Sequence, residues 1–142
     1  MAHWTPSNHN NADEYIGSCL PYVTSSTAAN LSAGGMPHVI SFPYVTRWII
    51  IQNNGDGGAG TPALRIGFTG NGIFGFGSSD GRDHYFQVGE GQGTGRLELK
   101  VKEIMVGGVG GTPAYNVIAG YTNIPTKNFP TLTGSAGFKG VG

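Results

Sequence analysis

One apolar run, residues 45–53, is bounded on both sides by residues that end regular structure. In an extended chain its large apolar side chains would point to both sides, Trp48 and Ile50 to one and Ile49 and Ile51 to the other. Pro43 lacks a backbone donor, and the Asn- and Gly-rich residues 54–58 favour turns, so the run is limited to strand length. We therefore predict a central strand that is covered on both faces.

Glycine makes up 26 of the 142 residues, well above its usual share of about 7%. The glycines follow no fixed period, which excludes a collagen helix. They also disfavour α-helices, since each interior Gly costs about 1 kcal/mol relative to Ala. A chain of this length is sufficient for one domain with a hydrophobic core.

Further short β-like segments, separated by Gly-rich turns, lie at residues 38–42, 64–69, 84–88, 96–106 and 115–121. In 96–106 the apolar alternation shifts by one residue at Lys102–Glu103, which predicts a β-bulge. A helix is the competing interpretation, but Leu97, Leu99 and Val101 would then scatter around it. Residues 70–72 are predicted to form a turn, and 73–77 a short strand or an aromatic loop tip.

These segments predict an all-β fold, an antiparallel β-sandwich of the single jelly-roll type, with irregular N- and C-terminal arms. The expected division is an extended N-terminal arm at 1–36, a β-sandwich domain at 37–125 and an irregular C-terminal arm at 126–142. The arms are polar and carry scattered aromatic residues, which pack either on their own domain or on a neighbouring subunit. The candidate interface residues are Trp4, Tyr15, Tyr22, Phe129 and Phe138.

The chain carries few charges. Only 11% of its residues are charged, and eight basic residues balance eight acidic ones, where about 25% charged is ordinary. A neutral surface promotes association, so the expected partners are copies of the same chain. The sequence contains no basic patch that would indicate binding to nucleic acid.

Cys19 alone cannot form an intrachain disulfide. No membrane span or secretory signal is predicted, so we expect synthesis in the cytoplasm.

Two motif matches are interpreted as chance. Residues 70–75 fit the dinucleotide pattern G-x-G-x-x-G, but the residues after them do not predict the helix that the pyrophosphate needs. Residues 77–81 fit the nucleophile-elbow pattern G-x-S-x-G, with Asp83 and His84 nearby, yet such an elbow works in an α/β sheet. We predict that the chain is not an enzyme and assign no catalytic residue and no cofactor.

The loop carboxylates Asp56, Asp80 and Asp83, with His84, are the residues that could hold a hard cation. Their order does not match an EF-hand, and Asp in a turn usually accepts backbone hydrogen bonds, so no metal site is assigned and the question stays open. Tyr85 and Tyr121 are candidate carbohydrate contacts, because sugars stack on aromatic rings and many lectins are jelly rolls. Core packing is the alternative role of these rings.

Four segments together resemble the single jelly-roll capsid proteins of large DNA viruses, such as the penton and minor capsid proteins of algal viruses. They are residues 47–53, 64–72, 97–101 and 115–125. The resemblance lies in strand order, and the long outer insertions that would carry a host-attachment spike are missing. It implies a virion protein with its β core at a vertex or on the capsid surface, contacting copies of itself, as a pentamer, and other capsid proteins. The alternative is a carbohydrate-binding β-sandwich module, lectin-like in character.

Overall fold

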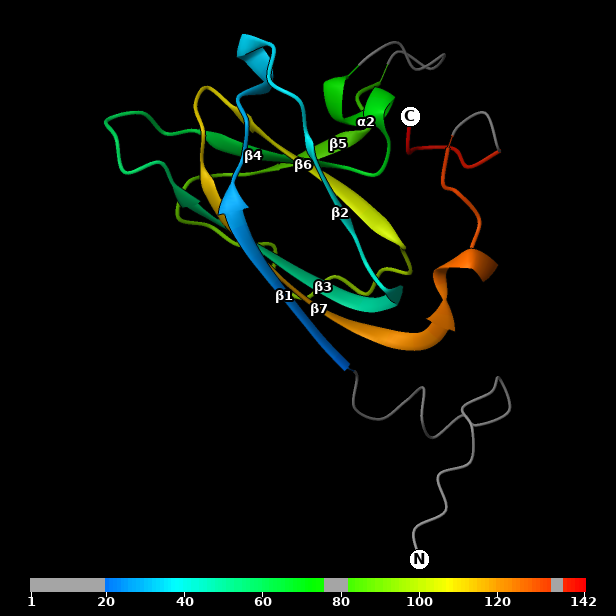
Figure 1. Ribbon diagram of the computed structural model, residues 1–142. Helices are drawn as coiled ribbons and strands as arrows, with labels where there is room; N and C mark the ends of the chain where they lie inside the picture. Colours follow the sequence, from blue (N-terminus) through cyan, green and yellow to red (C-terminus); the bar gives the residue numbers. More distant parts are fainter. Residues whose placement is uncertain (1–19, 76–81, 134–136) are drawn as a thin grey trace, which may run out of the picture.

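The protein is a two-layer β-sandwich. The structure is a computed structural model that describes residues 20–75, 82–133 and 137–142. Two antiparallel sheets pack face to face (Figure 1), which confirms the predicted fold class. Sheet A contains, in spatial order, β1 (Leu20–Thr27), β7 (Ala114–Pro125) and β3 (Tyr44–Gly55). Sheet B contains β2 (His38–Ser41), β6 (Glu103–Val109), β4 (Ala63–Gly67) and β5 (Tyr85–Val88). The short helical elements are η1 (Leu31–Ala33), α2 (Gly70–Phe74) and η2 (Thr126–Asn128).

An extended segment, residues 91–99, completes sheet A along the free edge of β3. Leu97 donates a backbone hydrogen bond to the Ile49 carbonyl at 2.8 Å, and Thr94 donates to the Ile51 carbonyl at 2.9 Å. Within the described residues, this segment and the seven labelled strands can be numbered 1 to 8 in chain order, so that residues 91–99 are number 6, β6 is number 7 and β7 is number 8. The spatial order is then 1-8-3-6 in sheet A and 2-7-4-5 in sheet B. This is the strand order of a single jelly roll.

The core lies between the sheets and consists of alternate side chains from each strand. Its fully buried members are Ile49 and Ile51 of β3, Val117 and Ala119 of β7, Leu64 and Ile66 of β4, and Ile104 and Val106 of β6. Burial of each of these Ile, Leu and Val side chains contributes roughly 1.5–3 kcal/mol. The alternation of inward and outward residues therefore fixes which face of each sheet meets the other.

Strand β3 has one buried face, and the prediction that it is covered on both sides is wrong. Ile49 and Ile51 are buried, whereas Trp48 and Ile50 on the opposite face are only half-buried. A sandwich of two layers has no third layer to cover the outer face of a sheet. An apolar run in such a fold therefore leaves part of its surface in contact with solvent.

The apolar phase shift at Lys102–Glu103 marks a change of sheet, so the predicted continuous, bulged strand over 96–106 is wrong. Leu97 pairs with β3 in sheet A, while β6 begins at Glu103 and pairs with β2 and β4 in sheet B. Val101 and Ile104 are both buried on either side of this crossing. The chain turns over the open end of the sandwich at Lys102, which reverses the side that faces the core.

Residues 70–74 form α2, so the predicted turn and aromatic strand or loop tip are corrected here to a one-turn helix. The Thr69 hydroxyl accepts a hydrogen bond from the Gly72 N–H at 2.9 Å and caps the helix, and Gly75 ends it at a φ of 71°. A single turn with Gly at two of its five positions is too short to show a helical period. Residues 76–81 lie outside the described residues.

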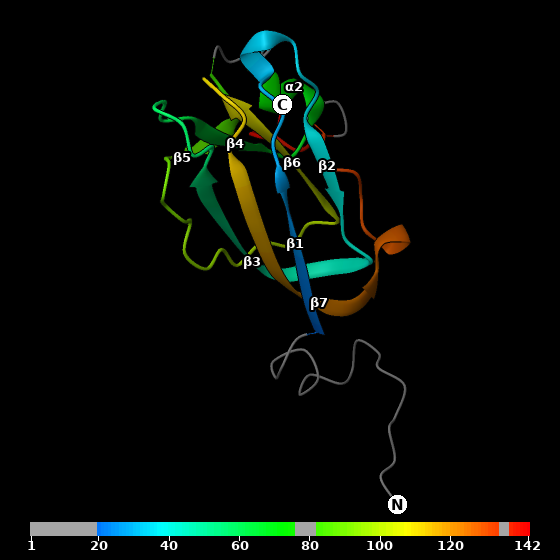
Figure 2. The same cartoon turned by 60° about the vertical axis from the view of Figure 1, so that its left-hand side comes forward.

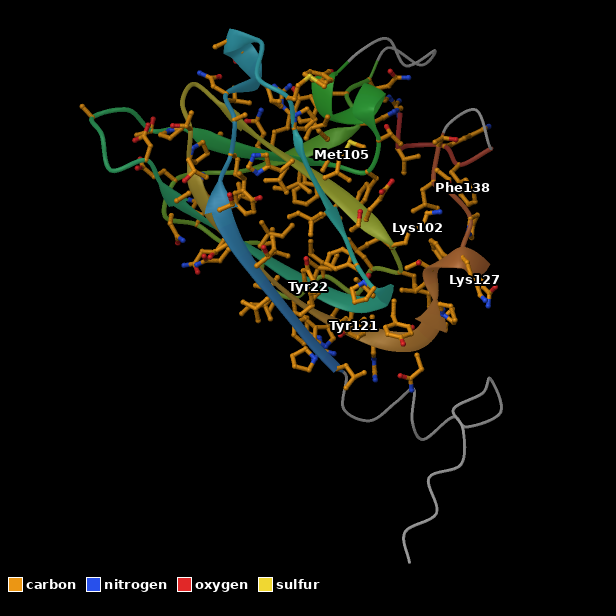
Figure 3. The ribbon with its side chains drawn as sticks, viewed as in Figure 1. Tyr22, Lys102, Met105, Tyr121, Lys127 and Phe138 are labelled. Atoms are coloured by element: carbon orange, nitrogen blue, oxygen red, sulfur yellow. The ribbon has the colours of Figure 1, made fainter. Side chains whose placement is uncertain are left out.

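The described parts of both predicted arms lie on the domain itself. Residues 20–33, within the segment assigned to the N-terminal arm, form β1 and η1, and β1 pairs with β7 along its whole length. At the other end, Leu132 packs against the core, and Lys102 donates to the Thr131 hydroxyl at 3.0 Å and to the Phe129 carbonyl at 3.4 Å. Figure 3 shows Lys102 beside this C-terminal segment.

Candidate functional site

Part of the outer face of sheet B is covered by residues of the same chain, while Val39 of β2 on this face is 52% exposed. Leu31 of η1 lies over Gly107 of β6, where an added Cβ would come within 2.5 Å of the Leu31 side chain. Ile73 of α2 is fully buried and lies over Gly67 of β4, where the same test gives 2.9 Å. In Figure 1, η1 and α2 both lie on the side of sheet B. Two glycines thus let two helical elements close over this sheet.

Arg65 on the same face takes part in this cover. Its Nη1 donates to the Ile73 carbonyl at 3.1 Å, and its guanidinium carbon lies 3.8 Å from the centroid of the Tyr85 ring. Its side chain is half-buried beside α2. The cation–π contact occupies one face of the Tyr85 ring.

The outer face of sheet A carries an exposed apolar row. Val23 of β1 lies opposite Ile118 of β7, which lies opposite Ile50 of β3. Val23 is 68% exposed and Ile118 is 40% exposed, while Ile50 is half-buried. We call these three residues the apolar row. Hydrophobic side chains aligned across three strands form one continuous surface, unlike scattered single ones.

The rows on either side define the limits of this surface. On one side lies the polar row Ser25, Asn116 and Gln52, and on the other the row Pro21, Gly120 and Trp48. The Arg96 guanidinium lies 5.4 Å from the Trp48 ring and forms an ion pair with Glu98 at 2.7 Å. The apolar row thus has a polar border on the Asn116 side, and charged groups lie beside Trp48 on the other; an apolar centre with a polar rim is the usual anatomy of a protein interface.

The sequence did not identify the apolar row as a site, because residues 20–27 were not recognised as a strand. Their side chains alternate, with Tyr22 and Thr24 half-buried and Val23 and Ser25 exposed, but Ser and Thr weaken the hydrophobic period. The available signal was the run of β-branched residues Val23, Thr24 and Thr27 within a charge-free stretch.

The predicted interface residues are not brought together as a single surface. Trp4 and Tyr15 lie outside the described residues. Tyr22 packs inside the domain, edge-on to Phe42 with 5.2 Å between ring centroids. Phe129 and Phe138 are half-buried in the C-terminal segment, where the Phe138 N–H donates to the Thr133 carbonyl at 3.1 Å. Figure 3 labels Tyr22 and Phe138 in well-separated parts of the molecule.

The two candidate carbohydrate contacts belong to different sheets. Tyr85 begins β5 in sheet B, and its hydroxyl donates to the Asp83 carboxylate at 3.2 Å. Tyr121 is in β7 of sheet A and stacks on Tyr44, with 5.5 Å between centroids and 26° between ring planes. These two tyrosines therefore do not form one platform for a sugar.

A hydrogen bond between two side chains connects the two sheets. The Tyr115 hydroxyl of β7 lies 2.9 Å from Nδ1 of His38 in β2. Burial raises the pKa of the Tyr115 phenol above its ordinary value; a hydrogen bond with Ser26 lowers it, and the neighbouring Tyr22 raises it. The phenol thus remains protonated and hydrogen-bonded at neutral pH.

The candidate cation ligands are engaged in other contacts or lie outside the described residues. Asp56 accepts a hydrogen bond from the Gly58 N–H at 2.9 Å, and Asp83 accepts from Tyr85. Asp80 is outside the described residues. Within 20–75, 82–133 and 137–142, no group of three or more His, Cys, Asp or Glu residues is arranged to hold a metal ion.

None of the helices in these ranges has the length and apolar character needed to cross a membrane.

Comparisons of the chain with protein-family models, with curated proteins and with solved structures give no match.

Proposed function

We propose that this protein is a structural subunit that assembles with copies of itself, as a capsid component of a virus. The observation that carries the proposal is the difference between the two sheets. Leu31, Ile73 and Arg65 of the same chain cover part of the outer face of sheet B, where Val39 stays 52% exposed, whereas the outer face of sheet A presents the whole apolar row to solvent. An exposed apolar surface of this kind on a folded domain marks an interaction site.

The charge distribution supports self-association. The net charge is zero, and β1 and β7, which form two of the three strands of sheet A, contain no charged residue. Copies of such a surface approach one another without repulsion. A charge-depleted, apolar centre is also what distinguishes the core of an interface from other protein surface.

The capsid assignment draws on the jelly-roll strand order together with the resemblance to viral single jelly-roll capsid proteins, and the virion is the location it implies. Jelly rolls serve in viral capsids and in lectins alike, so the fold by itself does not choose between them. The two proposed carbohydrate contacts lie in different sheets, while the apolar row is continuous. The arrangement therefore favours assembly over a sugar-binding platform.

The test is to place one charge in the apolar row and the same charge just outside it. Ile118→Asp introduces a carboxylate in the middle of the row, and Asn116→Asp introduces one on the same strand and face, in the neighbouring polar row. Light scattering should show a concentration-dependent assembly for the wild type and for Asn116→Asp, and monomers for Ile118→Asp. Electron microscopy of the assembled wild type should show closed, symmetric particles or rings. A wild type that stays monomeric at every concentration contradicts the proposal.

A further inference from the structure

Within the described residues, strand β1 is an edge of sheet A. It pairs with β7 on one side, and no strand in the described part of the chain pairs with its other side. Figure 2 shows β1 as the last strand on one side of this sheet. Natural edge strands are usually guarded by charged residues, proline, bulges or brevity. β1 has eight residues, no charge and no register shift against β7, and its one proline, Pro21, lies next to its first residue.

The free edge can be assigned to particular backbone groups. Just beyond β1, the Ala28 N–H donates to the Pro113 carbonyl at 2.8 Å, on the β7 side. Because backbone groups alternate in direction along a strand, the even-numbered residues of β1 face β7 and the odd-numbered ones face the free edge. Pro21, which lacks an N–H, belongs to the second set, as expected for proline in an edge strand. Val23 and Ser25 therefore direct their N–H and carbonyl groups outward.

The apolar row ends at this same edge, because Val23 is its outermost member. We propose that two copies of the chain pair edge to edge through β1, antiparallel, about a two-fold axis at Val23. The A sheets of the two copies then form one continuous sheet. The row Ile50, Ile118 and Val23 of one copy continues directly into Val23, Ile118 and Ile50 of the other. This inference rests on the proposed function. It identifies the pairing of two β1 strands as the contact through which copies of the chain associate.

A second copy of the chain fits this edge because β1 can face an identical strand across a two-fold axis without placing like charges together. In such an interface each residue near the axis lies close to its own counterpart, so a charged residue there would face a like charge. β1 has none, and Val23 opposite Val23 is a favourable β-branched pair. The two outward-directed Val23 backbones can exchange two N–H···O hydrogen bonds.

Cysteine cross-linking tests this register directly. In a Cys19→Ser parent, which removes the native thiol, Val23→Cys should form a disulfide-linked dimer under mild oxidation, because two Cα atoms within about 7 Å can be bridged. Thr27→Cys is the matched control on the same exposed strand. In the proposed register its two copies lie eight residues apart, about 26 Å at roughly 3.3 Å per residue, and should not link.

A second pair of variants tests the edge without a cross-link. Ser25→Pro removes an outward N–H and leaves the bonds to β7, so it should abolish the dimer while circular dichroism shows the β fold retained; Ser25→Ala should still dimerise. Equal cross-linking of Val23→Cys and Thr27→Cys, or assemblies in which Val23→Cys never links, overturn the edge pairing and leave the proposed function standing. A Cys19→Ser parent that is monomeric at every concentration overturns both.

Discussion

The Thr46 side-chain hydroxyl accepts a hydrogen bond from the Val101 N–H at 3.0 Å, while the Thr46 N–H donates to the Val101 carbonyl at 2.9 Å. The same hydroxyl donates to the Leu99 carbonyl at 2.7 Å. Thr46 is completely buried, and these bonds hold the chain where it leaves sheet A for sheet B. The Thr46 hydroxyl thus provides a hydrogen-bond partner for both the Val101 N–H and the Leu99 carbonyl at the crossing.

Thr46→Val should destabilise the protein by about 1–3 kcal/mol, because the buried Val101 N–H loses a partner and a nearly isosteric methyl cannot replace it. Urea denaturation followed by circular dichroism measures the change. Thr61→Val, the same substitution at an exposed loop position, should change stability by less than about 0.5 kcal/mol. Equal effects of the two substitutions would exclude a structural role for the Thr46 hydroxyl.

Asn53 should be among the most sensitive polar positions. Its buried amide donates to the carbonyls of Pro62 and Val88, each at 2.9 Å, and its carbonyl accepts from the Gly55 N–H at 2.8 Å. Asn53→Ala should cost about 2–4 kcal/mol in the free energy of unfolding. Asn53→Asp should cost more, since a carboxylate cannot donate to the two carbonyls.

Chemical denaturation of both Asn53 variants checks this order. Asn54→Ala is the control, because the neighbouring residue has the same side chain and is exposed. An Asn53→Asp variant as stable as the wild type would show that the amide is not the donor.

Gly107→Ala should displace η1 from sheet B. The new Cβ would come within 2.5 Å of the Leu31 side chain, and overpacking of this kind typically costs about 1–3 kcal/mol. Adding Leu31→Ala should relieve the clash, so the double variant should lose less stability than the two single variants added together. A double-mutant cycle measures this coupling. A second cycle with Gly70→Ala in place of Gly107→Ala is the control, because an added Cβ at Gly70 meets nothing within 4 Å. In that cycle the stability changes of Gly70→Ala and Leu31→Ala should simply add.

The stability of the protein should fall in alkali through Tyr115. Burial raises the pKa of its phenol above the ordinary value of about 10, so the folded state holds the proton more tightly than the unfolded state. This contribution to stability is complete below the unfolded pKa and is lost as the pH rises through the folded pKa. Tyr115→Phe should remove that part of the pH dependence.

The measurement is the free energy of unfolding between about pH 8 and about pH 11. Parallel curves for the wild type and Tyr115→Phe would show that another group controls alkaline unfolding.

Much of the sandwich could be predicted because its inner strands alternate strongly. Leu64 and Ile66 in β4, and Val117 and Ala119 in β7, all face the core as their period of two requires. The phase shift at Lys102–Glu103 was also visible, but sequence cannot distinguish a bulge within one sheet from a crossing between two. Both place successive apolar residues on opposite sides of the chain, and only the partner strands differ.

The candidate site was harder to predict because it depends on contacts between distant segments. Val23 and Ile118 are 95 positions apart in the numbering and become neighbours only when β1 pairs with β7. The cover of sheet B was equally hidden, since Gly67 and Gly107 acquire their roles from Ile73 and Leu31. Composition did indicate the general character of the surface, because the scarcity of charge left little with which to protect an edge.

The pairing of Leu20 with Tyr121 joins the first described strand to the last. Such a contact of large sequence separation forms slowly, and during synthesis it must wait until β7 has emerged from the ribosome. Until then neither the apolar row nor the β1 edge exists as a surface, because each needs β7 in place between β1 and β3. The order of synthesis therefore means that the surface proposed for association exists only once the fold of the chain is complete.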